Sequence, residues 1–436
     1  MRFRSTQVVD CGECALMTRH VAAQQVERRL GFVEFVVLIA ALQALGALSI
    51  DSMLPNLPAI GASLGVMDEN RRQLVITAYL LALGVSQVVY GPLADRFGRR
   101  PVLLTGLVIF VAFSLLATLA PTFELLLLAR ALQGVGAAAC RTITVSVVRD
   151  RYVGREMARV ISLTSMVFMA VPIMAPALGQ LVLMVASWRW LFGLLGLVGA
   201  ALLVWTLTRL PESLHPEDRL PIQPRRIARA FATAALNRTS VGYILGQAFL
   251  FGGLLGFITS AQQVVAEALG AGDRFPLIFA ICASFIAVAS LLNARLVMRL
   301  GMRRLSHAAL LGYVAVAAVH LAVVLSGHET LAVFVVCQAA TMFCFGLASG
   351  NFGAMAMEPM GHIAGVASSF QGFVSMVGAS LIGFAVGQAF NGTIVPLEAG
   401  YLLCGLCALA AVLTAEDGRL FQPHEVDGAP CGSPAE

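Results

Sequence analysis

Apolar runs of spanning length recur along almost the whole of this chain of 436 residues. A helix that rises about 1.5 Å per residue crosses the bilayer core with roughly 20 apolar residues. The chain is 58% hydrophobic and 12% charged, whereas globular domains have roughly 45–50% and about 25%. We therefore predict an all-α membrane protein with twelve transmembrane helices, at 32–54, 73–92, 102–120, 124–146, 160–184, 190–208, 240–260, 275–297, 305–326, 331–351, 362–388 and 397–415.

The longest break between these runs, 209–239, is rich in proline and charge and separates two bundles of six helices. The cationic string at 96–100, after the second span, returns at 299–304, after the eighth, which indicates an internal repeat. The predicted organisation is an N-terminal tail at 1–30, a first bundle at 31–208, a central loop at 209–239, a second bundle at 240–415 and a C-terminal tail at 416–436.

The arginines predict the orientation. All 29 basic residues are arginine, and most lie in loops on the same side as both chain ends. Only Arg71, Arg72, Arg189 and Arg274 fall in loops on the other side. Because loops rich in arginine stay in the cytoplasm, we expect both tails and the central loop to be cytoplasmic.

The composition also excludes several classes of protein. Without lysine the chain has neither a Walker A loop nor a Schiff-base nucleophile. The net charge of +5 arises from the loop arginines, so no nucleic-acid partner is expected. The strings at 61–65 (GxSxG) and 134–139 (GxGxxA) lie outside any strand–turn–helix context. The histidines do not cluster at metal spacing. We expect no enzyme, no catalytic residue, no metal and no cofactor.

Asp51, near the outer end of the first span, is the main candidate for proton coupling, because charge inside a bilayer is costly. Glu34, Glu124 and Glu358 begin or end spans, which leaves Asp51 as the expected buried carboxylate. Since burial favours the neutral form of a carboxylic acid, Asp51 can bind and release a proton. The alternative is a static charge partner or an exposed residue at the outer rim.

Arg130 and Arg141 lie about three turns apart on one face of the fourth span. Arg130 is expected at a depth similar to that of Asp51, where pairing and release would modulate proton binding; a permanent ion pair is the alternative. Arg141, nearer the cytoplasm, is a candidate for attracting an anionic or electron-rich substrate, or for bracing the loop below. Gly134, between them, is small enough for a helix or a ligand to approach.

Other candidates are prolines and amides. Pro172, Pro176 and Gly179 predict a kinked, narrow fifth span suited to close packing at a moving interface. Gln247 and Asn351 are the polar candidates for substrate contact in the second half, although buried amides also join helices.

These residues resemble a drug:proton antiporter of the major facilitator superfamily, of the twelve-span kind and the Bcr/CflA branch, over about 32–415. The string at 91–100 resembles the loop signature of the superfamily. The string at 130–136 resembles its fourth-helix motif, and 51–58 resembles a string of the branch itself.

The resemblance implies the major facilitator fold and a set of conformational switch residues. It implies that Asp95 latches onto nearby arginines and a helix end, stabilising the outward-facing state. Gln43 stands where some related carriers have a second carboxylate, and we assign it to substrate binding. The implied switch residues are Gly91, Asp95, Arg96, Gly98, Arg99, Arg100, Pro172, Pro176 and Gly179.

The function expected from the resemblance is export of small drug-like compounds in exchange for protons, conferring multidrug or antibiotic resistance. The carrier would lie in the bacterial inner membrane as a monomer, with spans 1, 4, 7 and 10 lining the cavity and the proton gradient as its energy source. The alternatives are a proton-coupled uptake carrier or uniporter for a small metabolite, and a membrane sensor that transports nothing.

Overall fold

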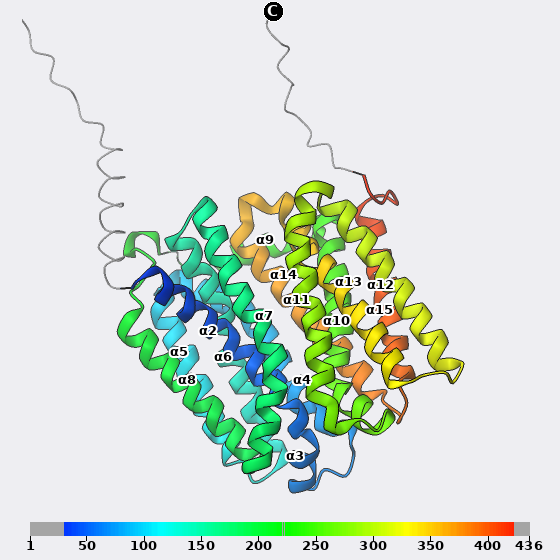
Figure 1. Ribbon diagram of the computed structural model, residues 1–436. Helices are drawn as coiled ribbons and strands as arrows, with labels where there is room; N and C mark the ends of the chain where they lie inside the picture. Colours follow the sequence, from blue (N-terminus) through cyan, green and yellow to red (C-terminus); the bar gives the residue numbers. More distant parts are fainter. Residues whose placement is uncertain (1–29, 220, 222, 423–436) are drawn as a thin grey trace, which may run out of the picture. The chain divides into compact units, whose positions relative to one another are not determined.

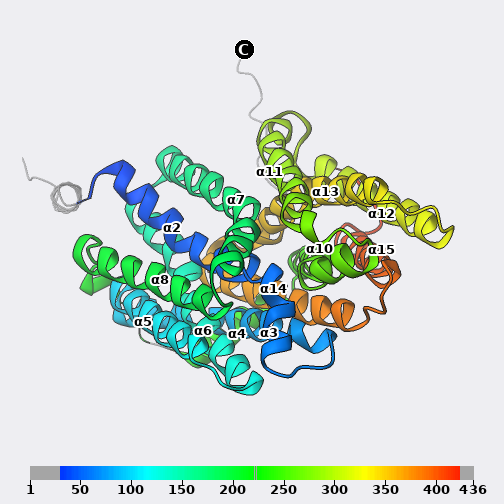
Figure 2. The same ribbon diagram turned by 60° about the horizontal axis from the view of Figure 1, so that its bottom comes forward.

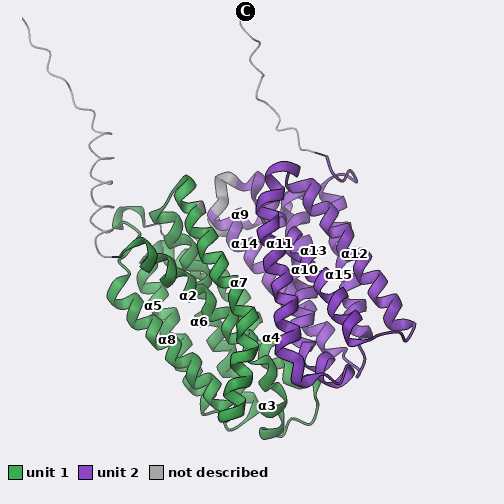
Figure 3. Cartoon of the chain, viewed as in Figure 1, with its two compact units in different colours: residues 1–224 green, residues 225–436 purple. Residues whose placement is uncertain are grey.

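A computed structural model describes residues 30–219, 221 and 223–422, and every regular element in that part of the chain is a helix (Figure 1). Twelve of these helical segments are long and apolar enough to cross a membrane, which confirms the predicted fold class. Of the predicted tails at 1–30 and 416–436, residues 1–29 and 423–436 lie outside the described residues. The chain forms two compact units, Met1–Pro224 and Arg225–Glu436 (Figure 3), and their boundary falls inside the predicted central loop.

The first unit contains spans 1 to 6. Its helices are α2 (Phe32–Asp51), η1 (Leu54–Asn56), α3 (Leu57–Ser63), η2 (Asn70–Gln73), α4 (Leu74–Phe97), α5 (Arg99–Thr118), α6 (Phe123–Arg151), α7 (Gly154–Val185), α8 (Arg189–Arg209) and η3 (Pro216–Asp218).

The second unit contains spans 7 to 12. Its helices are α9 (Pro224–Leu236), α10 (Arg238–Gln263), η4 (Val264–Ala268), η5 (Gly272–Arg274), α11 (Phe275–Leu300), α12 (Met302–Leu325), α13 (Leu331–Met357), η6 (Glu358–Ile363), α14 (Ala364–Gln388) and α15 (Val395–Ala415).

Helix packing follows the same scheme in both units. In the first unit α2 packs against α7, α6 against both α4 and α5, and α5 against α8. In the second, α10 packs against α14, α13 against both α11 and α12, and α12 against α15 (Figure 2). The corresponding spans of the two halves therefore make corresponding contacts, as the repeated cationic string suggested.

The first span is a broken helix. α2 ends at Asp51, and the chain continues through the short 3₁₀ turn η1 into α3. Pro55 and Pro58 are the second residues of these two elements, where a missing N–H group leaves no helical hydrogen bond unmade. The break places the carboxylate of Asp51 at a helix end rather than in the middle of a continuous span.

The predicted central loop contains a helix of its own. α8 continues to Arg209, and α9 occupies Pro224–Leu236, directly before α10 begins at Arg238. The ring of Phe231 in α9 lies 5.2 Å from that of Phe370 in α14. Ala234 is buried with Met360 and Ala367. One face of α9 is apolar and covered by its own unit, which the count of prolines and charges did not reveal.

Candidate functional site

Asp51 is buried at the end of α2, with 4% of its surface exposed. Among the described residues, no side chain forms an ion pair or a hydrogen bond with its carboxylate. The predicted burial is present, and none of the described residues supplies a cationic partner in this conformation.

The fifth span approaches the backbone beside Asp51. Gly179 in α7 lies so close to the Ser52 carbonyl that an added Cβ would meet its carbon at 2.8 Å and its oxygen closer still. The side chain of Asn56 donates hydrogen bonds of 3.1 Å to both the Ser52 and the Gly179 carbonyl oxygens. Gly179 therefore lets α7 pack directly onto the helix break.

Arg130 is fully buried in α6 and bridges three helices. Its Nε donates to the Val75 carbonyl in α4 at 3.0 Å, and one terminal nitrogen donates to the Ser49 carbonyl in α2 at 3.2 Å. The other donates to Gln133 Oε1 at 2.5 Å, and the guanidinium lies 4.3 Å from the centre of the Tyr79 ring. Carbonyl dipoles and an aromatic face thus stabilise the cation without a carboxylate.

These contacts can be compared with the predicted pairing of Arg130 with the carboxylate of Asp51. The guanidinium contacts α2 at Ser49, two residues before Asp51, and no ion pair joins it to that carboxylate. The alternative of a permanent ion pair is therefore not seen in this conformation. A neighbouring helix fills the space beside Gly134, because a Cβ added there would meet the backbone of Tyr79 in α4.

Gln43 and Arg141 lie at one junction between α2 and α6. Gln43 Nε2 donates to the Thr144 hydroxyl at 3.3 Å. Arg141 precedes Thr144 by one turn, so the two share a helix face. Arg141 is exposed, and no ion pair or hydrogen bond of its side chain occurs within the described residues. A guanidinium that no carboxylate neutralises can attract an anionic or electron-rich group.

In the second unit the predicted amides join helices. Gln247 in α10 accepts a hydrogen bond from Gln371 in α14 at 2.8 Å and donates to the Ser349 carbonyl in α13 at 3.3 Å. Asn351 is buried in α13 and exchanges hydrogen bonds of 2.8 and 3.3 Å with Asn293 in α11. The side-chain amide of Asn351 is thus engaged in hydrogen bonds to a neighbouring helix. Gln247 is only half-buried.

The loop between α4 and α5 is organised around Arg99. Gly98 adopts φ +104°, a conformation that glycine permits, and turns the chain directly from one helix into the next. The buried guanidinium of Arg99 pairs with Asp95 and, at 2.9 Å, with Asp150 at the end of α6. The carboxylate of Glu212 accepts from the backbone N–H of Arg99 at 2.8 Å and caps α5.

The second unit repeats this arrangement with its own residues. Gly301, with φ +79°, joins α11 to α12. Arg303 pairs with Glu358, directly after α13, at 2.8 Å and with Glu416, directly after α15, at 2.9 Å. Both units therefore hold one arginine between acidic residues at the ends of two other helices. Sequence reasoning found the arginines and missed the acids Asp150, Glu212 and Glu416, whose signal is their place at the ends of corresponding spans.

The remaining predicted switch residues lie in helices. Gly91 is half-buried in α4, and Arg96 is exposed near its end. Arg100 donates to the Leu207 carbonyl in α8 at 2.5 Å. α7 runs as one helix through both Pro172 and Pro176.

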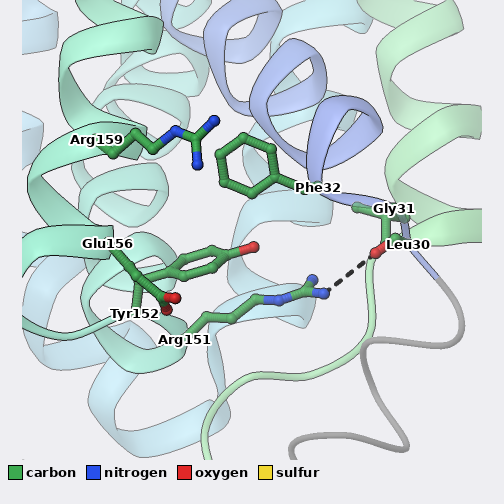
Figure 4. Close-up of a pocket in the computed structure, with 7 residues that line it drawn as sticks. All are labelled: Leu30, Gly31, Phe32, Arg151, Tyr152, Glu156 and Arg159. Atoms are coloured by element: carbon green, nitrogen blue, oxygen red, sulfur yellow. Dashed lines mark hydrogen bonds between the residues drawn. The ribbon is translucent and has the colours of Figure 1, made fainter.

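A pocket of about 240 Å³ lies beside the start of α2. Figure 4 shows the guanidinium of Arg159 turned toward the Phe32 ring, 5.0 Å away. It also shows Arg151 reaching the Leu30 carbonyl at 3.3 Å. Both arginines brace the beginning of the first span.

Asp51 is not the only buried carboxylate, contrary to expectation. Glu398, in the first turn of α15, is fully buried beside His320 of α12, which is also fully buried. Glu329, in the connection between α12 and α13, lies on the other side of the same imidazole. The signal in the sequence was an acidic residue inside the twelfth predicted span, and it was overlooked.

Comparisons with known proteins agree with this architecture. A family model described as Major Facilitator Superfamily matches residues 39–383. The crystal structure of a D-xylose-proton symporter superposes with a TM-score of 0.70 at 13% identity, covering 90% of this chain and 99% of that one. At that identity the likeness concerns the fold.

Curated relatives match nearly the full length. The uncharacterized MFS-type transporter YdgK of Bacillus subtilis is 30% identical, covering 80% of this chain and 87% of the relative. A bicyclomycin resistance protein homolog of Haemophilus influenzae is 28% identical, covering 87% and 94%. The multidrug resistance protein MdtL of Escherichia coli is 27% identical, covering 90% and 98%. With twelve spanning helices among its described residues, this chain is a multi-pass inner-membrane transporter of small molecules, and it belongs to the Major Facilitator Superfamily.

Proposed function

We propose that the chain exports small drug-like compounds in exchange for protons. The names of two relatives, a bicyclomycin resistance protein homolog and a multidrug resistance protein, support the drug class. The proton gradient supplies the energy, no cofactor takes part, and the carrier acts as a monomer with both termini in the cytoplasm, where most arginines lie.

The observation that carries the proton part is the buried, unpaired carboxylate of Asp51. An ionised carboxylate without a partner is costly in such a place, whereas its protonated form is not. Protonation therefore suits this conformation. Loss of the proton favours another conformation in which a cation or water reaches the carboxylate, and that difference couples the proton to movement.

The surroundings of Asp51 suggest how movement is transmitted. Arg130 holds the α2 backbone two residues before Asp51, and Gly179 contacts it one residue after. A shift of α2 on ionisation would act on α6 through the first contact and on α7 through the second. Arg141 and Gln43 are the proposed substrate contacts of the first unit, and Gln247 is that of the second.

Proton release from inverted membrane vesicles tests this proposal. Vesicles with a preformed acidic interior would receive neutral, anionic and cationic antimicrobials in turn. A transported compound should collapse the gradient with the wild type and not with Asp51→Asn. The matched control is Asp273→Asn, which changes an exposed aspartate in the same way and should behave like the wild type. If both aspartate variants respond as the wild type does, Asp51 carries no proton.

The alternatives give other results in the same preparation. A proton-coupled uptake carrier would move its substrate into right-side-out vesicles and not into inverted ones. A sensor would keep its signalling function in Asp51→Asn and would release no protons with any compound.

A further inference from the structure

His320 in the second unit lies between two carboxylates that the proposed function leaves without a role. Its Nδ1 is 2.9 Å from Glu398 Oε2, and its Nε2 is 3.1 Å from Glu329 Oε1. His320 lies about 27 Å along α12 from Met302. The cluster is therefore at the end of the unit opposite to the Arg303 cluster. It links α12, the connection to α13 and the start of α15.

The charges of these three residues do not balance when all are ionised. One imidazolium and two carboxylates carry a net charge of −1, in a place where His320 and Glu398 are fully buried. The titratable groups that face the cluster are thiols and phenols, and among the described residues none of them is cationic. They are Cys337 of α13, Tyr401 of α15 and Tyr313 of α12. Neutrality therefore requires two protons shared by the three residues.

The cluster also has spare hydrogen-bonding capacity. The contact between Glu398 and His320 is close but not aligned as a hydrogen bond, and neither Glu398 oxygen has a hydrogen-bond partner among the described residues. Glu329 Oε2 is likewise buried without a hydrogen-bond partner among the described residues. Buried acceptors of this kind are stabilised by a proton on one of them.

Polar groups extend from the cluster in both directions. The side chain of Glu329 is 11% exposed, so the cluster reaches the surface of the unit at this residue. On the inner side, Tyr401 lies one turn after Glu398 and accepts a hydrogen bond from Gln338 at 2.6 Å. The neighbouring Tyr313 hydroxyl lies against α10 at Gly253. α10 is the seventh span, which the family resemblance places beside the substrate cavity.

We propose that His320, Glu329 and Glu398 form a second proton-binding site, separate from Asp51. The ligand is a proton taken up by a carboxylate oxygen of Glu398 or Glu329 while the imidazolium of His320 stays between them. Only the use of this proton in transport rests on the proposed function, since binding itself does not.

Infrared titration of the reconstituted chain tests the site without transport. The C=O stretch of protonated carboxyl groups would be followed between about pH 5 and 8 in an Asp51→Asn background, so that Asp51 contributes nothing. We expect a titrating carboxyl band that Glu398→Gln removes. Glu329→Gln should shift its midpoint, and this variant keeps the test valid if the change at the fully buried Glu398 prevents folding. His328→Gln is the control, because His328 is exposed in the same connection and bonds Ser326.

The outcomes separate the two proposals. A band that persists unchanged in both glutamate variants, or its absence from the Asp51→Asn background, overturns the second site. A chain that fails to exchange drugs for protons while this band titrates refutes the proposed function and leaves the site in place.

Discussion

Replacing Gly179 by alanine tests whether direct packing of α7 on the helix break matters. The added Cβ would lie 2.8 Å from the Ser52 carbonyl carbon and closer still to the oxygen, whereas ordinary contact begins at 3.4 Å. Because the neighbour is backbone rather than a flexible side chain, α2 and α7 must move apart. The hydrogen bond from Asn56 to the Gly179 carbonyl would be strained by the same movement.

The expected cost follows from two opposing terms. Overpacking costs about 1–3 kcal/mol, and the higher helix propensity of alanine returns up to about 1 kcal/mol. Gly350→Ala is the matched control, since its Cβ would meet nothing within 4 Å in the helix α13. That variant keeps only the gain in propensity. Gly179→Ala should therefore be less stable than Gly350→Ala by roughly 1–3 kcal/mol, or about 2–12 °C for units of this size.

Thermal unfolding of both purified variants in one detergent would measure this difference. A drug-efflux assay would show whether the altered packing beside Asp51 reduces transport. We expect Gly179→Ala to unfold at a lower temperature and to export less, while Gly350→Ala does neither. A Gly179→Ala protein at least as stable as the control would show that α2 and α7 do not pack as described.

Two further predictions concern the charged networks. Arg130→Lys should lower thermal stability by roughly 2–4 kcal/mol, because an ammonium lacks the planar geometry with which the guanidinium bridges two carbonyls and Gln133. The control Arg141→Lys, at an exposed position, should unfold like the wild type. Equal unfolding temperatures for the two variants would contradict the network. Glu212→Gln should lower stability by about 1 kcal/mol through loss of the charged cap on α5. The control Glu217→Gln changes an exposed glutamate nearby and should leave stability unchanged. Equal unfolding temperatures for the two variants would show that the cap is not needed.

The spans and the halves were predictable because the bilayer imposes a local requirement. Each crossing needs roughly 20 apolar residues in one stretch, so a one-dimensional pattern locates it. The repeat was visible for a similar reason, since the turn from α11 to α12 requires the same glycine and arginines as the turn from α4 to α5. Asp51 was also found from the sequence alone, because a carboxylate stands out within an apolar run.

What the tertiary structure decided is the choice of partners. Arg130 contacts the Ser49 carbonyl rather than the Asp51 carboxylate, and no pattern of side chains encodes a bond to backbone. Arg99 meets Asp150 and Glu212, which follow it by 51 and 113 residues. Such pairs depend on distances of a few ångström between helices that are far apart along the chain. Those distances are set by how all six helices of a unit pack together, whereas the length and polarity of each helix are set by its own residues and the membrane around it.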